Sequence, residues 1–87
     1  MVSRNPTVWK HKKGLLYSAE FGEIELSNGD TVTFSNFDSS ENLLEAYFIK
    51  KTDGLEMTCT HAAANVVTVT GAGTNIDCLY IVYGAKA

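Results

Sequence analysis

The sequence lacks the features that would tie the chain to a membrane or to a secretion route. None of its apolar runs approaches the roughly 18 residues that span a bilayer. Lys10, His11, Lys12 and Lys13 stand where a signal peptide would have its apolar stretch. We therefore expect a soluble, unsecreted chain with no membrane partner.

Sets of residues that could carry catalysis or hold a metal are also missing. Cys59 and His61 would share one face of a strand, but zinc sites need three or four ligands and no second pair supplies them. His61 has no nucleophile or acid at a recognisable spacing that would make it a general base. The glycine-rich segment TGAGTN, residues 70–75, lacks the lysine and the following helix of a phosphate loop. We predict no metal, no cofactor and no catalytic residue, and therefore no enzyme.

Three glutamates, Glu20, Glu23 and Glu25, lie close together and could be taken for catalytic carboxylates. On a strand, Glu23 and Glu25 would share a face about 7 Å apart, a separation found between the acid and the base of glycosidases. Here, however, the glutamates alternate with apolar residues, which is typical of the solvated face of a hairpin. We interpret these carboxylates as surface groups.

The two cysteines, Cys59 and Cys78, could form a disulfide between neighbouring strands. An unsecreted chain keeps its thiols reduced, and free cysteine is commonly buried as a small hydrophobic residue. We favour reduced, buried cysteines and keep the disulfide as the alternative.

The composition is that of an ordinary folded domain with unevenly placed charge. Hydrophobic residues make up 45% of the 87 residues and the net charge is -3, which suits one small globular domain. Residues 1–13 carry four basic residues and no acid, giving +4 (4 - 0), whereas residues 14–87 carry three lysines and ten acids, giving -7 (3 - 10). The only proline, Pro6, biases Asn5 to an extended conformation. We predict an extended basic arm over residues 1–13 and a folded domain over residues 14–87.

The arm also holds the only tryptophan, Trp9, whose large ring needs a surface to pack on. That surface is either its own domain or a neighbouring chain. Four basic charges on an acidic body are weak grounds for binding phosphates, so no nucleic-acid partner is expected. We predict instead that Arg4, Lys10, Lys12 and Lys13 contact a neighbouring protein.

Glycine turns separate short stretches of alternating apolar and polar residues through the rest of the chain. Six or seven strands are predicted, at residues 14–20, 21–26, 30–36, 43–51, 55–61, 65–70 and 76–83. Turn signals recur about every 8 to 12 residues, which is typical of sandwiches and barrels. We predict an all-β fold, a single small antiparallel β-sandwich of the jelly-roll or immunoglobulin-like kind.

The first predicted hairpin is GEIELSNGDTVTF, residues 22–34. A three-residue loop over 27–29 pairs Ile24 with Val32 and so matches apolar residues on one face. Such a loop places Gly29 in the left-handed conformation that glycine tolerates best.

The second predicted hairpin turns at Asp53-Gly54, with Lys50 opposite Met57. A helix competes with its first strand over residues 43–51, because several apolar residues there have helical spacing. The strand is favoured, since tyrosine, phenylalanine and isoleucine are enriched just before the turn.

The last predicted strand, residues 76–83, is apolar on both faces. One face carries Ile76, Cys78, Tyr80 and Val82, and the other carries Leu79, Ile81 and Tyr83. An antiparallel strand normally has one wet face. If the first face fills the core, the second needs a cover, which is either another chain or the basic arm folded back with Trp9. We favour another chain.

The segments VVTVTGAGTNIDCLYIVYGAKA, residues 66–87, and GEIELSNGDTVTF, residues 22–34, resemble small structural proteins of tailed bacteriophages. In such proteins a Thr/Val strand, a Gly-rich turn and a last apolar strand ending in Tyr-Gly or similar complete a β-sandwich. The similarity covers the C-terminal quarter of the chain and only a general pattern elsewhere. The resemblance implies a virion component, often a capsid decoration (cement) protein, and brings no catalytic residue with it.

We therefore predict a non-enzymatic phage virion protein, a capsid decoration protein that forms a homo-oligomer, with a trimer favoured, and stabilises the head lattice. Its partners would be copies of itself and the major capsid protein or another virion protein. It would be located in the virion, assembled in the cytoplasm of the bacterial host. The predicted oligomer or capsid interface consists of Leu79, Ile81, Tyr83, Trp9, Arg4, Lys10, Lys12 and Lys13.

Two other functions stay open at this point. One is a tail, neck or head-fibre component of the virion. The other is a small lectin-like receptor-binding module, in which an exposed aromatic side chain beside a polar one would hold a sugar. Tyr17, Phe37 with Asp38, and Tyr47 are the aromatic residues available for such a site.

Overall fold

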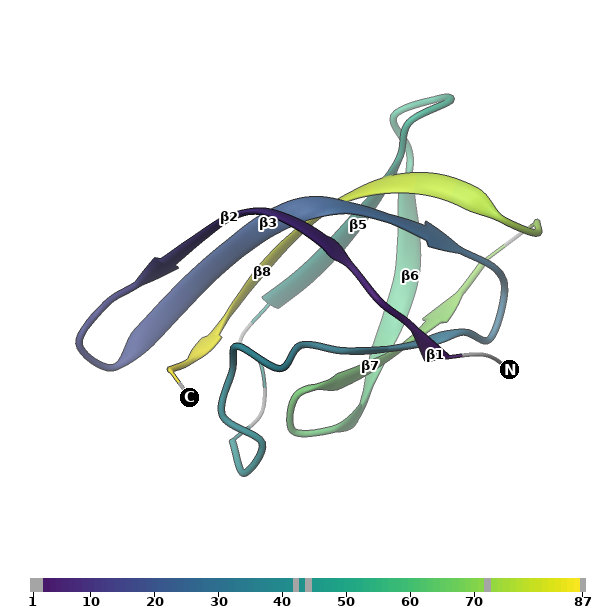
Figure 1. Ribbon diagram of the computed structural model, residues 1–87. Helices are drawn as coiled ribbons and strands as arrows, with labels where there is room; N and C mark the ends of the chain where they lie inside the picture. Colours follow the sequence, from purple (N-terminus) through teal and green to yellow (C-terminus); the bar gives the residue numbers. More distant parts are fainter. Residues whose placement is uncertain (1–2, 42, 44, 72, 87) are drawn as a thin grey trace.

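The computed structural model of the chain describes residues 3–41, 43, 45–71 and 73–86, with residues 61–63 described by their backbone alone (Figure 1). The described residues form strands and turns and contain no helix that is long and apolar enough to span a membrane. The strands are β1 (Ser3–Arg4), β2 (Thr7–Lys13), β3 (Tyr17–Leu26), β4 (Thr31–Thr33), β5 (Glu45–Lys50), β6 (Glu56–Ala63), β7 (Val66–Thr70) and β8 (Ile76–Ala85). The predicted all-β fold is confirmed.

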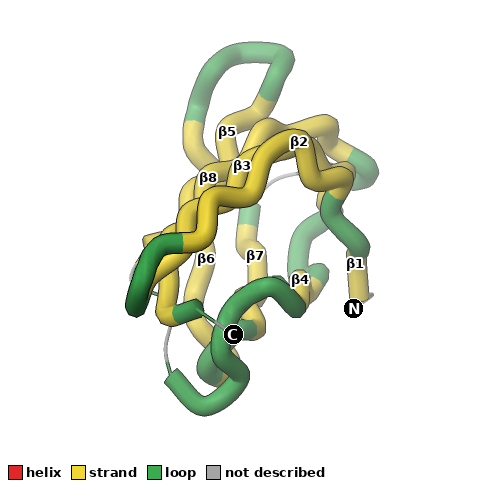
Figure 2. Tube along the Cα trace, turned by 60° about the vertical axis from the view of Figure 1, so that its left-hand side comes forward, coloured by secondary structure: helices red, strands yellow, loops and turns green. Residues whose placement is uncertain are grey.

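The strands join in one sheet with the order β1-β4-β7-β6-β5-β8-β3-β2. All neighbouring strands are antiparallel except β1 and β4, which are parallel. The sheet is strongly curled, so that β1, β4 and β7 lie on one side of the molecule and β2, β3 and β8 on the other, with β6 shared between the two halves (Figure 2). The core lies between the two halves.

Side-chain alternation along the strands fills this core. The rings of Phe34, Phe48 and Tyr80 meet at centroid distances of 5.4 to 6.4 Å, and all three side chains are buried. The predicted strands at 14–20 and 21–26 are one continuous strand, β3, in which every second residue is buried. This long strand pairs with β8 along its whole length.

The predicted pairing of Ile24 with Val32 is wrong. After β3 the chain crosses to the opposite half of the sheet, and Val32 pairs with Val67 of β7. Both valines are fully buried there, and this burial outweighs the local preference for a hairpin. The turn itself is as predicted at Gly29, which has a φ of 86°. Asp30 closes the turn, because its carboxylate accepts a hydrogen bond from the Ser27 backbone N–H at 2.8 Å.

The second hairpin is present, and the helix considered for residues 43–51 is not: Glu45–Lys50 is the strand β5. Its register differs by two residues from the prediction, because Met57 lies opposite Phe48 instead of Lys50. A longer turn causes the shift. The Gly54 N–H donates to the Lys50 carbonyl at 2.9 Å, and Gly54 has a φ of 73°. A shift by two keeps every side chain on its predicted face and buries Met57 in the core.

Residues of the predicted basic arm supply both edge strands of the sheet. β1 pairs with β4, and the chain then crosses to the other half, where β2 pairs with β3 (Figure 1). Gly22 on β3 allows the close approach of β2, since a Cβ atom there would clash with the Thr7 carbonyl oxygen. The edge strand β2 therefore depends on close backbone packing as well as on hydrogen bonds.

Both cysteines are free. Cys78 is buried, and Cys59 is half-buried against the core with its thiol 3.3 Å from the Ala46 carbonyl oxygen. Burial raises the pKa of both thiols, which lowers their thiolate content and their reactivity. The predicted core position is confirmed for Cys78, whereas Cys59 is only partly buried and packs against the core from its margin.

Candidate interaction surface

The second face of strand β8 is the most distinctive surface of the molecule. Along this strand Cys78, Tyr80 and Val82 point into the core and are buried. The side chains between them stay in solvent, with exposed fractions of 37% for Leu79, 43% for Ile81 and 44% for Tyr83. The two-sided pattern in the sequence thus corresponds to a core face and an apolar outer face.

Register places other strands' side chains in rows beside those of β8. In one row Lys10 of β2, Phe21 of β3, Ile81 of β8 and Tyr47 of β5 lie side by side. In the next row the corresponding residues are Lys12, Ala19, Tyr83 and Glu45. We call the surface formed by these two rows together with Trp9 and Leu79 the outer face.

Trp9 joins the outer face through an irregularity in β2. The register of β2 against β3 shifts between Val8 and Lys10, which leaves Trp9 as an extra residue. Its ring meets Phe21 edge-on at a centroid distance of 6.4 Å, and its indole N–H donates to Glu23 at 2.9 Å. The ring packs on its own sheet yet remains 51% exposed. It therefore borders the apolar rows and does not cover β8.

A hollow of about 490 Å³ lies at one end of the outer face. Its lining includes Lys12, Tyr17, Ala19, Glu45 and Tyr83. Ala19 has the smallest side chain of its row, so the hollow is a gap between the larger side chains on either side. A bulky apolar group from another molecule would fit this gap.

Charges of opposite sign lie at the two edges of the outer face. Lys10 and Lys12 are on the β2 edge, and neither forms an ion pair with any residue that the structure describes. Glu45 is on the β5 edge, two residues before Tyr47 and on the same face of the strand. Hydrogen bonding to the Glu45 carboxylate and its negative charge raise the pKa of Tyr47. The outer face thus has a basic edge, an aromatic centre and an acidic edge.

Two basic residues predicted for the interface lie away from the outer face. Lys13 pairs with Ser18 and so falls on the other side of the strand. Arg4 binds within the chain: its guanidinium donates to Asp30 at 2.7 Å, to Asn75 at 2.9 Å and to Ser27 at 3.2 Å. The structure gives Arg4 a role in fastening β1 to the turn after β3.

Replacing Arg4 should therefore affect folding and not assembly. Arg4→Ala removes the 2.7 Å hydrogen bond that the guanidinium donates to the buried Asp30 carboxylate, and we expect the free energy of unfolding to fall by about 2 kcal/mol. Lys13→Ala, which removes the same charge from an exposed side chain, should change it by less than about 0.5 kcal/mol. Urea titrations of both variants test this. If the two variants were equally stable and Arg4→Ala self-associated more weakly, Arg4 would be an interface residue as predicted from the sequence.

A buried polar cluster lies beneath the outer face. The Glu20 carboxylate is only 2% exposed and accepts hydrogen bonds from the Tyr80 hydroxyl at 2.7 Å and from the Asn36 amide at 2.9 Å. Burial of Tyr80 and its hydrogen bond to Glu20 raise the pKa of Tyr80 far above its usual range. His11 on β2 lies opposite Glu20 in the strand register. The Nε2 atom of His11 is buried and has no hydrogen-bond partner among the described residues.

The interpretation of Glu20 as a surface group is wrong. Its place in the alternation could have identified it. Glu20 is separated from Ile24 and Leu26 by an even number of positions, so all three side chains point to the core side of β3. Its burial and its two hydrogen bonds make the cluster part of the core. Glu23 and Glu25 do lie at the surface, where Glu23 is 3.3 Å from Lys51 and Glu25 is 3.4 Å from Arg4.

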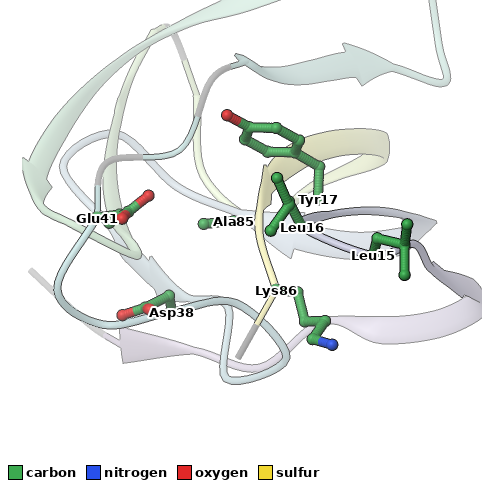
Figure 3. A pocket seen from close by; sticks show the side chains of 7 residues that line it. All are labelled: Leu15, Leu16, Tyr17, Asp38, Glu41, Ala85 and Lys86. Carbon is green, nitrogen blue, oxygen red and sulfur yellow. The ribbon is translucent and has the colours of Figure 1, made fainter.

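A second hollow of about 290 Å³ lies at the end of the β2–β3 turn (Figure 3). Asp38 and Glu41 line one side and Leu15, Leu16 and Tyr17 the other, with Ala85 and Lys86 between them (Figure 3). Its described lining contributes two carboxylates, Asp38 and Glu41, and the amine of Lys86.

Metal and sugar sites have little support in the described part of the chain. No group of three or more histidine, cysteine, aspartate or glutamate side chains there could hold a metal ion, and the side chain of His61 lies outside the described atoms. Of the aromatic residues considered for a sugar site, Phe37 is buried, whereas Tyr17 and Tyr47 are exposed.

Comparison with known proteins gives no relative from which a function could be transferred. No family model matches the chain, and no curated protein and no solved structure matches it either. The outer face is thus the feature of the described chain on which a function is best argued.

Proposed function

We propose that the chain is a non-catalytic structural protein that assembles through its outer face, and that it serves as a capsid decoration protein of a tailed phage. The observation that carries the assembly is the row of large apolar side chains that the fold leaves in water. The phage context comes from the resemblance of residues 66–87 to small virion proteins. A tail, neck or head-fibre position would use the same surface.

The size of the outer face suits a protein interface. Trp9, Phe21, Tyr47, Leu79, Ile81 and Tyr83 are each between 37% and 51% exposed. Together they present roughly 500 Å² of apolar surface, since a large aromatic side chain has about 200 Å² to bury. Covering that surface is worth roughly 12 kcal/mol before the costs of association. Aromatic residues are also the side chains most enriched at the centres of protein interfaces.

Sedimentation velocity over a range of concentrations tests the assembly, and mass spectrometry of purified virions tests the location. We expect the wild-type chain to form a defined oligomer at micromolar concentration and to be present in virions in many copies. A chain that stays monomeric at millimolar concentration and is absent from virions would overturn the proposal. Binding of oligosaccharides by such a monomer would favour the lectin-like alternative at the exposed tyrosines.

A further inference from the structure

We infer that two copies of the chain pair face to face through the outer face, about a two-fold axis that runs along the strands between β3 and β8. The inference rests on the proposed self-association and specifies its partner, symmetry and contacts. The arrangement is a dimer and replaces the trimer predicted from the sequence. In such a pair each copy uses the same surface, so every contact occurs twice.

The charges at the edges of the outer face select this axis. A two-fold axis along the strands places the β2 edge of one copy over the β5 edge of the other, so Lys12 meets Glu45 twice in the dimer. A two-fold axis across the strands would place the β2 edges over each other. Lysine would then face lysine, which is unfavourable. Charge complementarity therefore permits the first arrangement and opposes the second.

The sizes of the side chains fit the same axis. With the axis between β3 and β8, Ala19 of one copy lies opposite Tyr83 of the other. The Tyr83 ring then enters the hollow of about 490 Å³ that Ala19 leaves in its row. In the next row Phe21 lies opposite Ile81, and Lys10 lies over the Tyr47 ring, where a cation is attracted to the aromatic face. The large Tyr83 thus meets the small Ala19, and the Lys10 ammonium meets the Tyr47 ring.

The edges of the sheet offer no equally good route to a dimer. The exposed edge strand β2 carries Lys10, Lys12 and Lys13, and charged lysines on an edge are a common means of preventing edge-to-edge pairing. The other edge strand, β1, comprises Ser3 and Arg4 in the part of the chain that the structure describes. Packing of sheet faces about 10 Å apart avoids both edges and covers the apolar rows.

Exchange of the two edge charges tests the axis. Lys12→Glu places glutamate opposite Glu45, and Glu45→Lys places lysine opposite Lys12, so each variant alone should dimerise at least about tenfold more weakly than the wild type. An equimolar mixture restores both attractive pairs. We expect the mixture to form a heterodimer within about threefold of the wild-type affinity, measured by sedimentation velocity with one variant fluorescently labelled. Formation of the heterodimer also shows that both variants are folded.

Lys86→Glu and Glu41→Lys are the matched controls, because they make the same charge changes at exposed positions away from the outer face. They should dimerise as the wild type does. A wild-type trimer, or a dimer that neither Lys12→Glu nor Glu45→Lys weakens, would overturn this axis while self-association stands. A wild-type monomer at millimolar concentration would overturn the proposed self-association and this inference together.

Discussion

Tyr80→Phe should lower the free energy of unfolding by about 2 to 3 kcal/mol, although it removes a single oxygen atom. The Tyr80 hydroxyl donates a 2.7 Å hydrogen bond to the Glu20 carboxylate, and both side chains are almost completely buried. Hydrogen bonds to ionised groups are the stronger class, and a buried carboxylate that loses a donor cannot turn to water for a replacement. Urea titration followed by tryptophan fluorescence measures the loss.

Tyr83→Phe is the matched control, since it removes the same atom from a ring on the exposed outer face. It should change the free energy of unfolding by less than about 0.5 kcal/mol. A Tyr80→Phe variant as stable as Tyr83→Phe would show that the Glu20 carboxylate does not depend on this donor.

A double-mutant cycle then separates the energy of the Tyr80–Glu20 hydrogen bond from the other contributions of the two side chains. Glu20→Leu leaves the Tyr80 hydroxyl buried without its acceptor, whereas Glu20→Leu combined with Tyr80→Phe removes both members of the bond. The combined variant should therefore be more stable than the sum of the two single losses predicts. Additive losses would mean that the two groups contribute independently to stability, which would contradict the hydrogen bond that their 2.7 Å separation indicates.

The sequence predicts the strands of this fold better than it predicts their partners. Alternation of apolar and polar residues depends on each strand alone. The predicted ends of β5, β7 and β8 therefore lie within one or two residues of the ends in the structure. Partner choice depends on contacts distant in the chain. Val32 joins Val67 instead of Ile24, because the core is formed by two halves of a curled sheet and not by a local hairpin. No pattern within residues 22–34 contains that information.

The candidate surface was predictable in part for the same reason. Leu79, Ile81 and Tyr83 are on one strand, and their shared face follows from period-two alternation. Phe21 and Tyr47 join them only through strand order and register, which the sequence alone does not provide. Arg4 has the charge expected of an interface residue, but its position is decided by Asp30, a partner 26 residues away.

Substitutions at two adjacent residues of β8 should have opposite consequences. Val82→Glu should prevent folding, because Val82 is fully buried and lies opposite Glu20 on the neighbouring strand. A second carboxylate at that place is shielded from water and lies beside the first, and the cost is expected to exceed about 4 kcal/mol. Ile81→Glu introduces the same side chain on the outer face, where solvent reaches it in the monomer.

Ile81→Glu should leave a folded domain, with a loss of about 1 kcal/mol or less in the free energy of unfolding. Its self-association should fall by at least about a hundredfold, because in the assembled protein the charge would lose its water where the two apolar faces meet. Circular dichroism and sedimentation velocity measure the two effects separately. A folded Ile81→Glu variant that still assembles as the wild type does would show that the outer face remains in water. Assembly would then have to use another surface, and the residues of β8 that face away from the core would have no role in it.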